Sequence, residues 1–131
     1  MKSRLFILAI LAPILLAANA APPLYQLRVY QLNERSKALF HARFRDNAMR
    51  IMKRHGFDIA ATWEARHNGK PEFVYLLRWS DEVALQRAWK AFLADPEWIT
   101  IKRNTVSPEA PIMGDIEDRT MHLTDYSPAF R

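Results

Sequence analysis

Apolar and polar side chains alternate along residues 24–32, so that every second residue faces the same side of an extended chain. This period of two, with aromatic and β-branched members, predicts a β-strand. Along residues 34–55 the apolar residues instead recur at the spacing of one helix face: Phe40, Phe44, Ala48, Ile51 and Met52. We therefore expect an amphipathic helix here, with Asn33 as its N-cap and Gly56 as the left-handed residue that ends it.

Two extended runs, residues 57–67 and 71–79, flank the dipeptide Asn68-Gly69. Both central residues of a type I′ turn need positive φ, which asparagine and glycine adopt readily, so we expect a two-residue β-hairpin. The register of that hairpin places Trp63 opposite Val74, Ala61 opposite Leu76, Thr62 opposite Tyr75 and Ala60 opposite Leu77. Both faces of the hairpin are then largely apolar, and each must pack against another part of the protein or a partner.

A second helix is predicted after Ser80, which is a good N-cap and is followed by two acidic residues in the first turn. Its buried stripe is expected to contain Val83, Leu85, Ala88, Trp89 and Phe92. Asp95-Pro96 then starts a short helix that runs to about Lys102, because aspartate caps a helix and proline suits its first position. Residues 112–124 are expected to form a last strand with an interruption near Gly114.

The order strand, helix, hairpin, helix pair, strand is the split β-α-β pattern of an α+β, ferredoxin-like fold with an antiparallel sheet. In this topology the third strand lies between the first two, and the helices cover one face of the sheet. The other face is bare in a monomer, although it carries much apolar area. Such a face usually marks association, so we expect a homodimer in which two sheets pack face to face.

The N-terminus has the organisation of a secretory signal peptide. Lys2 and Arg4 precede an unbroken apolar run over residues 5–16, and small residues stand at Ala18 and Ala20. We expect cleavage after Ala20, which gives a signal peptide at residues 1–20 and a single domain at residues 21–131. The alternative is an uncleaved anchor, but the apolar run is shorter than the roughly 20 residues that span a bilayer. Cleavage would leave no stable membrane anchor and would place the protein in the periplasm or outside the cell.

The 131 residues suffice for one compact domain, and the chain has no cysteine. Disulfides, thiolate zinc sites and a cysteine nucleophile are therefore excluded, and an exported chain without disulfides favours the bacterial periplasm. After cleavage the chain carries 17 basic and 14 acidic residues, a net charge of +3. Export makes nucleic acid an unsuitable partner. The basic residues of the first helix are accordingly interpreted as a solvated outer face: Arg35, Lys37, Arg43, Arg45, Arg50, Lys53 and Arg54.

Several short motifs, in this order and spacing, resemble those of the NIPSNAP family. They are Tyr25-Gln26-Leu27-Arg28-Val29-Tyr30, Arg54-His55-Gly56-Phe57, Trp63, Ala94-Asp95-Pro96-Glu97-Trp98 and Leu123-Thr124-Asp125-Tyr126-Ser127-Pro128. The resemblance implies a ferredoxin-like subunit that pairs into a dimeric α/β barrel, in agreement with the two-sided hairpin. It implies no reaction and no catalytic residues. The signal peptide sets this chain apart from eukaryotic members, which are linked to mitochondria and vesicle traffic.

Aromatic residues are abundant for so short a chain, and two interpretations of them remain open. They pack the core and a dimer interface, or some of them line an apolar pocket between helices and sheet. In the second case Arg28 or Arg78 would hold an acidic group of the ligand. The two arginines equally suit a cross-subunit ion pair, with Glu64 as a partner. The candidate pocket residues are Arg28, Tyr30, His41, Trp63, Tyr75, Arg78 and Trp98.

The histidines lack the spacing of a metal site, so we predict no metal and interpret them as solvated surface residues: His41, His55, His67 and His122. No cofactor is predicted, and an axial haem ligand at His41 is kept as an alternative. The sequence contains neither a glycine-rich phosphate loop nor a convincing catalytic triad.

The sequence therefore predicts an exported NIPSNAP-like homodimer that binds a small apolar or aromatic ligand or a protein partner. It leaves open whether the protein is an enzyme. The alternative is a small cofactor-independent or haem-handling monooxygenase of the dimeric α/β barrel type, and it rests on fold analogy. Its pocket would be lined by His41, Trp63, Tyr75 and Trp98. A purely structural interaction module is a third interpretation.

Overall fold

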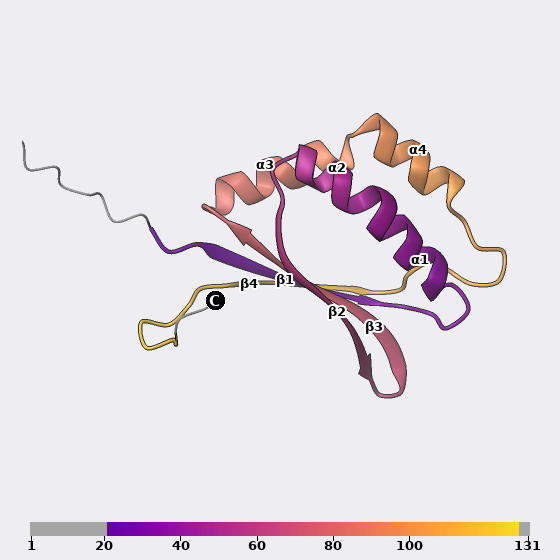
Figure 1. Ribbon diagram of the computed structural model, residues 1–131, viewed down its shortest axis with the longest axis horizontal. Coiled ribbons are helices and arrows are strands. Elements are labelled where there is room, and N and C mark those ends of the chain that lie inside the picture. Colours follow the sequence, from indigo (N-terminus) through magenta and orange to yellow (C-terminus); the bar gives the residue numbers. More distant parts are fainter. Residues whose placement is uncertain (1–20, 129–131) are drawn as a thin grey trace, which may run out of the picture.

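A computed structural model of the protein describes residues 21–128, so the predicted signal peptide at residues 1–20 lies outside the described residues. The strands are β1 (Leu24–Gln31), β2 (Asp58–His67), β3 (Lys70–Trp79) and β4 (Ile116–Met121). They form one four-stranded sheet in the order β2-β3-β1-β4, in which every neighbouring pair is antiparallel. The third strand thus lies between the first two, and the predicted α+β, ferredoxin-like split β-α-β fold is confirmed (Figure 1).

The helical segments all lie against one face of this sheet (Figure 1). They are α1 (Lys37–Arg43), the π-helical turn η1 (Phe44–Ala48), α2 (Met49–Arg54), α3 (Glu82–Leu93) and α4 (Pro96–Asn104). The predicted first helix is present, but its central turn is a π-helix. It begins after Ser36 instead of Asn33, whose side chain accepts a hydrogen bond from the backbone of Arg35. Gly56 ends it with φ of 85°, as predicted.

The caps of the later helices follow from short side chains at their first turns. Asp95 accepts hydrogen bonds from two backbone N–H groups of α4, and Pro96 occupies the first helical position, as predicted. The N-cap of α3 is Asp81, which accepts from the backbone of Ala84, so the prediction of Ser80 was wrong by one residue. Val83 is also wrongly placed in the buried stripe of α3. Val83 is 62 % exposed, because it precedes Leu85 by two residues and therefore points about 200° away from it around the helix.

The β2–β3 hairpin turns at Asn68 and Gly69, whose φ angles of 49° and 74° confirm the predicted type of turn. The predicted pairing of Trp63 with Val74 is also confirmed. The pairing of Ala60 with Leu77 is wrong, since the register shifts at this residue and Ile59 faces Leu77 instead. This β-bulge directs Ile59 towards the helices, where it packs against the core, while Ala61 and Trp63 face the opposite side.

The hydrophobic core lies between the helices and the sheet. Ile51 of α2 and Tyr75 and Leu77 of β3 are completely buried there. Aromatic rings from both layers pack edge to face or stack around them, with Phe44 only 4.5 Å from Phe73 between ring centroids. Burying one such side chain contributes about 1.5–3 kcal/mol, so these contacts fix the helices on the sheet.

The opposite face of the sheet has no helix against it in the described part of the chain (Figure 1). Its apolar side chains lie in register across three strands: Leu27, Val29, Ala61, Trp63, Val74 and Leu76. Trp63 is 48 % exposed. Met121 at the end of β4 and residues 122–124, which follow it, form a shallow groove with Tyr25 and Leu76 at one end of this face. The last strand is shorter than predicted, and within residues 21–128 every helix is too short or too polar to span a bilayer.

Candidate functional site

A cavity of about 110 Å³ lies between the helices and the β1–β4 side of the sheet. Its floor includes Arg28 and Tyr30 of β1, which share the helix-facing side of that strand. Its walls come from α1, η1, α2, α3, α4 and the segment before β4, and they are mainly apolar: Phe44, Met52, Trp89, Phe92, Trp98 and Met113 are among them. The cavity is thus a continuation of the core in which side chains from every helix meet.

The π-helical turn η1 shapes one wall of this cavity. The backbone N–H of Met49 donates to the carbonyl oxygen of Phe44, which is the i→i+5 bond of a π-helix. The widened turn brings Arg43, Phe44 and Ala48 to the cavity wall together. Single π turns inside α-helices occur frequently at functional sites, and this one coincides with the cavity.

Arg28 is the central polar group of the floor. Its Nη1 donates to Asp118 at 2.5 Å and its Nη2 donates to the hydroxyl of Tyr30 at 3.2 Å. The guanidinium carbon lies 4.5 Å from the ring centroid of Trp89, a cation–π contact. Its Nε is buried and has no hydrogen-bond partner among the described residues. Arg28 is therefore held rigidly but keeps one unsatisfied donor.

Two tyrosines extend this polar floor into the core. The hydroxyls of Tyr30 and Tyr75 lie 2.7 Å apart, so one donates to the other. Burial raises the pKa of Tyr75 well above its ordinary value. The floor is consequently a fixed chain of hydrogen-bonding groups from Arg28 through Tyr30 to Tyr75.

Gln26 positions the residues around Arg28, although its own side chain is only 2 % exposed. Its Oε1 accepts hydrogen bonds from the indole N–H of Trp79 at 3.1 Å and of Trp89 at 2.9 Å. Its Nε2 donates to both carboxylate oxygens of Asp118 at 3.0 Å. One amide thus orients the ring that covers Arg28 and the carboxylate that pairs with it.

Arg43 is a second cation in the cavity wall, and only 8 % of it is exposed. Its guanidinium carbon lies 5.6 Å from the ring centroid of Trp98, and Nζ of Lys102 lies 5.8 Å from the same centroid. Within residues 21–128, Arg43 has no hydrogen bond or ion pair through its side chain. Burial lowers its pKa. The prediction that Arg43 belongs to a solvated outer face is therefore wrong.

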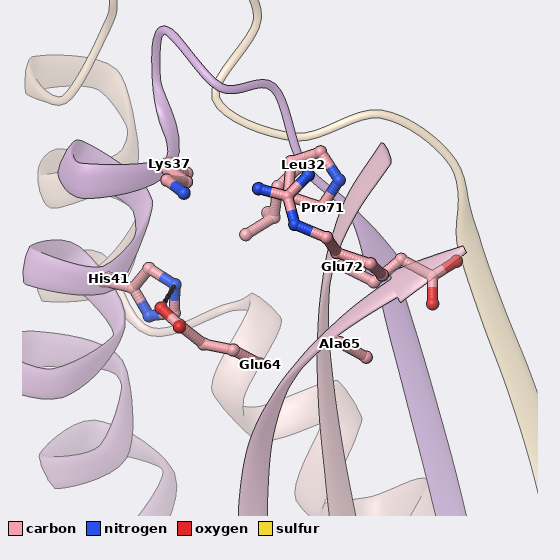
Figure 2. Close-up of a pocket in the computed structure, with 8 residues that line it drawn as sticks. Leu32, Lys37, His41, Glu64, Ala65, Pro71 and Glu72 are labelled. Carbon is pink, nitrogen blue, oxygen red and sulfur yellow. Dashed lines mark ion pairs between the residues drawn. The ribbon is translucent and has the colours of Figure 1, made fainter. Parts of the chain in front are cut away.

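A larger, more open groove of about 260 Å³ lies between α1 and the β2–β3 hairpin (Figure 2). Figure 2 shows His41 of α1 facing Glu64 of β2, and their Nε2 and Oε1 atoms are 3.1 Å apart. Most charges in and beside the groove pair with one another, since Glu34 also contacts Lys37 at 2.9 Å and Arg66 at 2.6 Å. Among the charged residues that line the groove, Glu72 alone has no ion pair within residues 21–128.

The haem alternative places His41 around one pocket with Trp63, Tyr75 and Trp98. The structure separates these residues, since His41 lies in the polar groove, where its Nε2 pairs with Glu64, while Trp98 lines the aromatic cavity. Among residues 21–128, no group of three or more His, Asp or Glu side chains could hold a metal ion.

An ion-pair cluster joins the end of α2 to the start of α4. Asp95 contacts Nε2 of His55 at 2.6 Å and Arg54 at 2.8 Å, and Glu97 contacts Arg54 and Arg50. Hydrogen bonds from Arg54 and His55 hold the pKa of Asp95 well below its usual value. Those from Arg50 and Arg54 lower the pKa of Glu97 to about 2. The prediction of solvated histidines is thus wrong for His55 and for His41, and His67 and His122 are exposed.

Comparison with known families decides the relationship that the motifs suggested, because the NIPSNAP sequence profile matches residues 25–128. The chain belongs to the NIPSNAP family. No curated protein is similar enough in sequence to count as a match.

Solved structures of NIPSNAP proteins share the fold. A NIPSNAP-like domain protein from Burkholderia xenovorans is 17 % identical, with a TM-score of 0.68 over 83 % of this chain and 91 % of its own. A NIPSNAP family protein of unknown function from Agrobacterium tumefaciens is 18 % identical, with a TM-score of 0.69 over 82 % and 93 %. SnoaB, a cofactor-independent oxygenase from Streptomyces nogalater, is 17 % identical, with a TM-score of 0.53 over 83 % and 100 %. At these identities the likeness shows the fold alone.

Three of the five motifs that suggested the NIPSNAP family meet at two places in this structure. Residues 25–30 supply Arg28 and Tyr30 to the floor of the cavity, and Gln26 orients Trp89 beside them. The segments 54–57 and 94–98 supply the ion-pair cluster, in which Asp95 both caps α4 and binds His55. The same segment places Trp98 in the cavity wall. Motifs that are far apart in sequence thus act together in one NIPSNAP subunit.

The seven candidate pocket residues do not all lie together. Arg28, Tyr30 and Trp98 line the aromatic cavity, and Tyr75 lies directly behind Tyr30. The other three lie elsewhere: His41 is in the polar groove, and Trp63 and Arg78 are on the helix-free face of the sheet, where Arg78 pairs with Asp58 at 3.0 Å. Within the described chain Arg28 pairs with Asp118 and Glu64 with His41. The cross-subunit pair with Glu64 stays a prediction.

Sequence reasoning missed the most informative members of the site: Gln26, Arg43, Trp89, Lys102 and Asp118. Gln26 and Asp118 are 92 positions apart and meet because β4 pairs with β1. One signal was available for Gln26, since it lies on the same side of the first predicted strand as Arg28 and Tyr30. No local signal distinguishes Arg43 from the exposed arginines of the same helix.

Proposed function

We propose that this NIPSNAP protein is an exported homodimer that binds a small apolar molecule in the cavity between its helices and its sheet. The observation that carries the binding proposal is the cavity itself, whose walls are mainly apolar and aromatic. Its few polar groups are Arg28 and Tyr30 on the sheet side and Arg43 and Lys102 on the helix side. Binding sites for small molecules commonly have this composition. The biochemical purpose of the binding is part of the same proposal: to hold or carry a ligand rather than to transform it.

The volume of the cavity limits the size of the ligand that it can hold. An unfilled apolar cavity of about 110 Å³ lowers stability by about 2–3 kcal/mol relative to a filled core. A cavity of this kind with a volume of about 150 Å³ accepts benzene. The ligand is therefore a molecule with one small ring or a short alkyl chain, with any larger part extending outwards past Lys102, which is exposed.

The helix-free face of the sheet supports the homodimer. Monomeric proteins rarely expose a contiguous apolar patch as large as one formed by three strands, and a second copy presents the same side chains in return. Light scattering during size-exclusion chromatography should give twice the subunit mass at micromolar concentration. The variant Trp63→Glu should give the single mass, whereas Val83→Glu, which alters an exposed residue on α3, should not. A monomeric wild-type protein would refute this part of the proposal.

Export is proposed from the basic and apolar pattern of residues 1–20. N-terminal sequencing of the protein isolated from its own host tests it. We expect a mature N-terminus at Ala21 and recovery in the periplasmic fraction or the medium. A chain that keeps Met1 and stays in the cytoplasm would contradict the proposal.

Methionine methyl groups provide a local test of binding. Met52 and Met113 line the cavity, whereas Met49 and Met121 are at least 36 % exposed and lie outside it. In protein labelled with ¹³C at methionine methyls, titration with the neutral probe benzamide should shift the signals of Met52 and Met113 and leave the other two unchanged. The absence of any selective shift up to millimolar benzamide would refute the binding proposal.

A cavity-filling variant makes this test specific. Ala48 is 1 % exposed and lines the cavity, so Ala48→Leu should occupy part of the space and abolish the benzamide shifts. Ala42→Leu adds the same side chain on the same helix outside the cavity and should leave the shifts intact. Circular dichroism establishes that both variants are folded, because overpacking a core site costs about 1–3 kcal/mol.

The oxygenase alternative has the fold likeness to SnoaB in its favour. It is separated from simple binding by measuring oxygen consumption with small phenols added to the purified protein. Oxygen consumption by the wild type that Ala48→Leu abolishes would show that the protein is an oxygenase and not a simple ligand-binding protein. Ligand binding without oxygen consumption supports the proposal.

A further inference from the structure

The cavity is unusual in the sign of the charges around it. Three basic side chains line it, Arg28, Arg43 and Lys102, and no acidic side chain of the described residues does. Asp118 pairs with Arg28 from outside the lining and offsets one of these charges. The remaining wall is apolar, so the cavity combines a dry interior with a net positive charge.

Arg43 is the buried cation of the cavity wall without an ion pair; Lys102 also has none among the described residues, but it is exposed. Arg43 is more than nine-tenths buried, it contacts the ring of Trp98, and its side chain has no hydrogen bond or ion pair within residues 21–128. No nitrogen of the Arg43 guanidinium is fully buried without a partner in the described chain, so the group keeps some contact with solvent. A largely desolvated charge without a counter-ion is nevertheless unfavourable. An aromatic face offsets only a small part of this cost. The position of Arg43 in the cavity wall therefore points to an anion that enters the cavity.

Arg28 supports the same conclusion from the opposite side of the cavity. Its two terminal nitrogens are satisfied by Asp118 and Tyr30, but its buried Nε has no acceptor among the described residues. That Nε is inaccessible to solvent, so Arg28 contributes the positive charge of its guanidinium group and not a free donor. Arg28 and Arg43 thus place two guanidinium groups beside the same cavity, and that of Arg28 is already paired with Asp118.

We propose that the ligand of this cavity is a small carboxylate, with an apolar ring or short chain between Trp89 and Trp98 and its head group bound by Arg43. The proposal rests on the proposed binding function and specifies its ligand. A carboxylate fits because its two oxygens match the planar guanidinium fork of Arg43. A phosphate fits less well, since its larger charge would lose more hydration in so small and apolar a space.

The test compares two probes of the same shape, benzoate and benzamide, by isothermal titration of the purified protein at pH 7. Benzoate should bind about 10- to 100-fold more tightly than benzamide, because a charge-assisted hydrogen bond contributes that much. The variant Arg43→Met should reduce this preference to less than about threefold. The control Arg103→Gln removes one exposed positive charge from α4 outside the cavity and should keep the full preference.

The outcomes separate this inference from the binding function on which it rests. Equal affinity for benzoate and benzamide would overturn the inference and leave the binding function standing. Failure of both probes to bind would refute the binding function. A benzoate preference that survives Arg43→Met would overturn the role of Arg43. Thermal unfolding provides a second readout: benzoate should raise the Tm of the wild type and of Arg103→Gln, but not that of Arg43→Met.

Discussion

The buried amide of Gln26 gives the most quantitative prediction. Replacing it by leucine keeps a similar volume but removes the acceptor shared by the indole N–H groups of Trp79 and Trp89 and the donor to Asp118. Trp79 is 4 % exposed, so its N–H cannot turn to water when the acceptor is lost. Trp89 is half-buried, so water can replace part of the hydrogen bond that its indole N–H loses.

The expected cost follows from these environments. A buried donor left without an acceptor costs about 1–3 kcal/mol, which applies to Trp79. The partly exposed donor of Trp89 contributes about 0.5–1.5 kcal/mol, the net value of an ordinary hydrogen bond. Gln26→Leu should therefore lower the free energy of unfolding by about 2–4 kcal/mol, a large share of the roughly 5–15 kcal/mol that holds a domain folded.

Equilibrium unfolding in urea measures this change. With an m-value of about 2 kcal/mol/M, the midpoint of the Gln26→Leu protein should fall by about 1–2 M. In a double-mutant cycle, Gln26→Leu introduced into Trp79→Phe should cost at least 1 kcal/mol less, because no buried N–H of residue 79 is then left unpaired. A loss below about 0.5 kcal/mol, or costs that simply add in the cycle, would refute the reasoning.

Three further predictions concern the fold around the site. Gly56→Ala should lower the free energy of unfolding by about 1 kcal/mol, because residue 56 has a φ of 85°; Gly114→Ala, at a residue without positive φ, should cost less. Tyr75→Phe should cost about 1 kcal/mol by removing the hydrogen bond to the neighbouring tyrosine. Stability should fall as the pH drops from about 4.5 towards 2, since ion pairs hold the pKa of Glu97 at about 2 and that of Asp95 below its usual value. The unfolded chain takes up these protons first, so acid favours unfolding.

Urea midpoints check the first two of these predictions, and thermal unfolding across a pH series checks the third. Equal losses for the two glycine variants would contradict the assigned backbone conformations. A Tyr75→Phe protein as stable as the wild type would show that the hydroxyl pair contributes nothing. The double variant Asp95→Asn, Glu97→Gln should flatten the acid limb of the pH profile, and an unchanged limb would assign the acid sensitivity to other carboxylates.

Local patterns predicted the elements whose causes are local. The turn at Asn68 and Gly69 needs positive φ at both residues, and few residue types adopt it, so the dipeptide sufficed to place the hairpin. Alternation and helical spacing likewise placed the strands and helices, and their order gave the split β-α-β topology. The bulge at Ala60 was missed because it follows from packing, which favours Ile59 over alanine against the core.

The site was harder to predict because its groups meet through tertiary contacts. The π turn at 44–48 leaves the apolar spacing of the helix almost unchanged, so periodicity alone could not reveal it. Arg43 lies among exposed arginines of the same helix, and the rings that cover it come from other elements. The partner of His55, Asp95, is 40 positions away in the sequence. In each case the decisive neighbour lies on another element.

The most direct test of the central claim is to locate a bound acid in crystals. Crystals grown with 4-bromobenzoate should give an anomalous bromine peak in the cavity beside Trp89 and Trp98, with the carboxylate within hydrogen-bond distance of Arg43. A peak confined to the helix-free face of the sheet or to the groove at His41, with none in the cavity, would contradict the claim that this cavity is the ligand site.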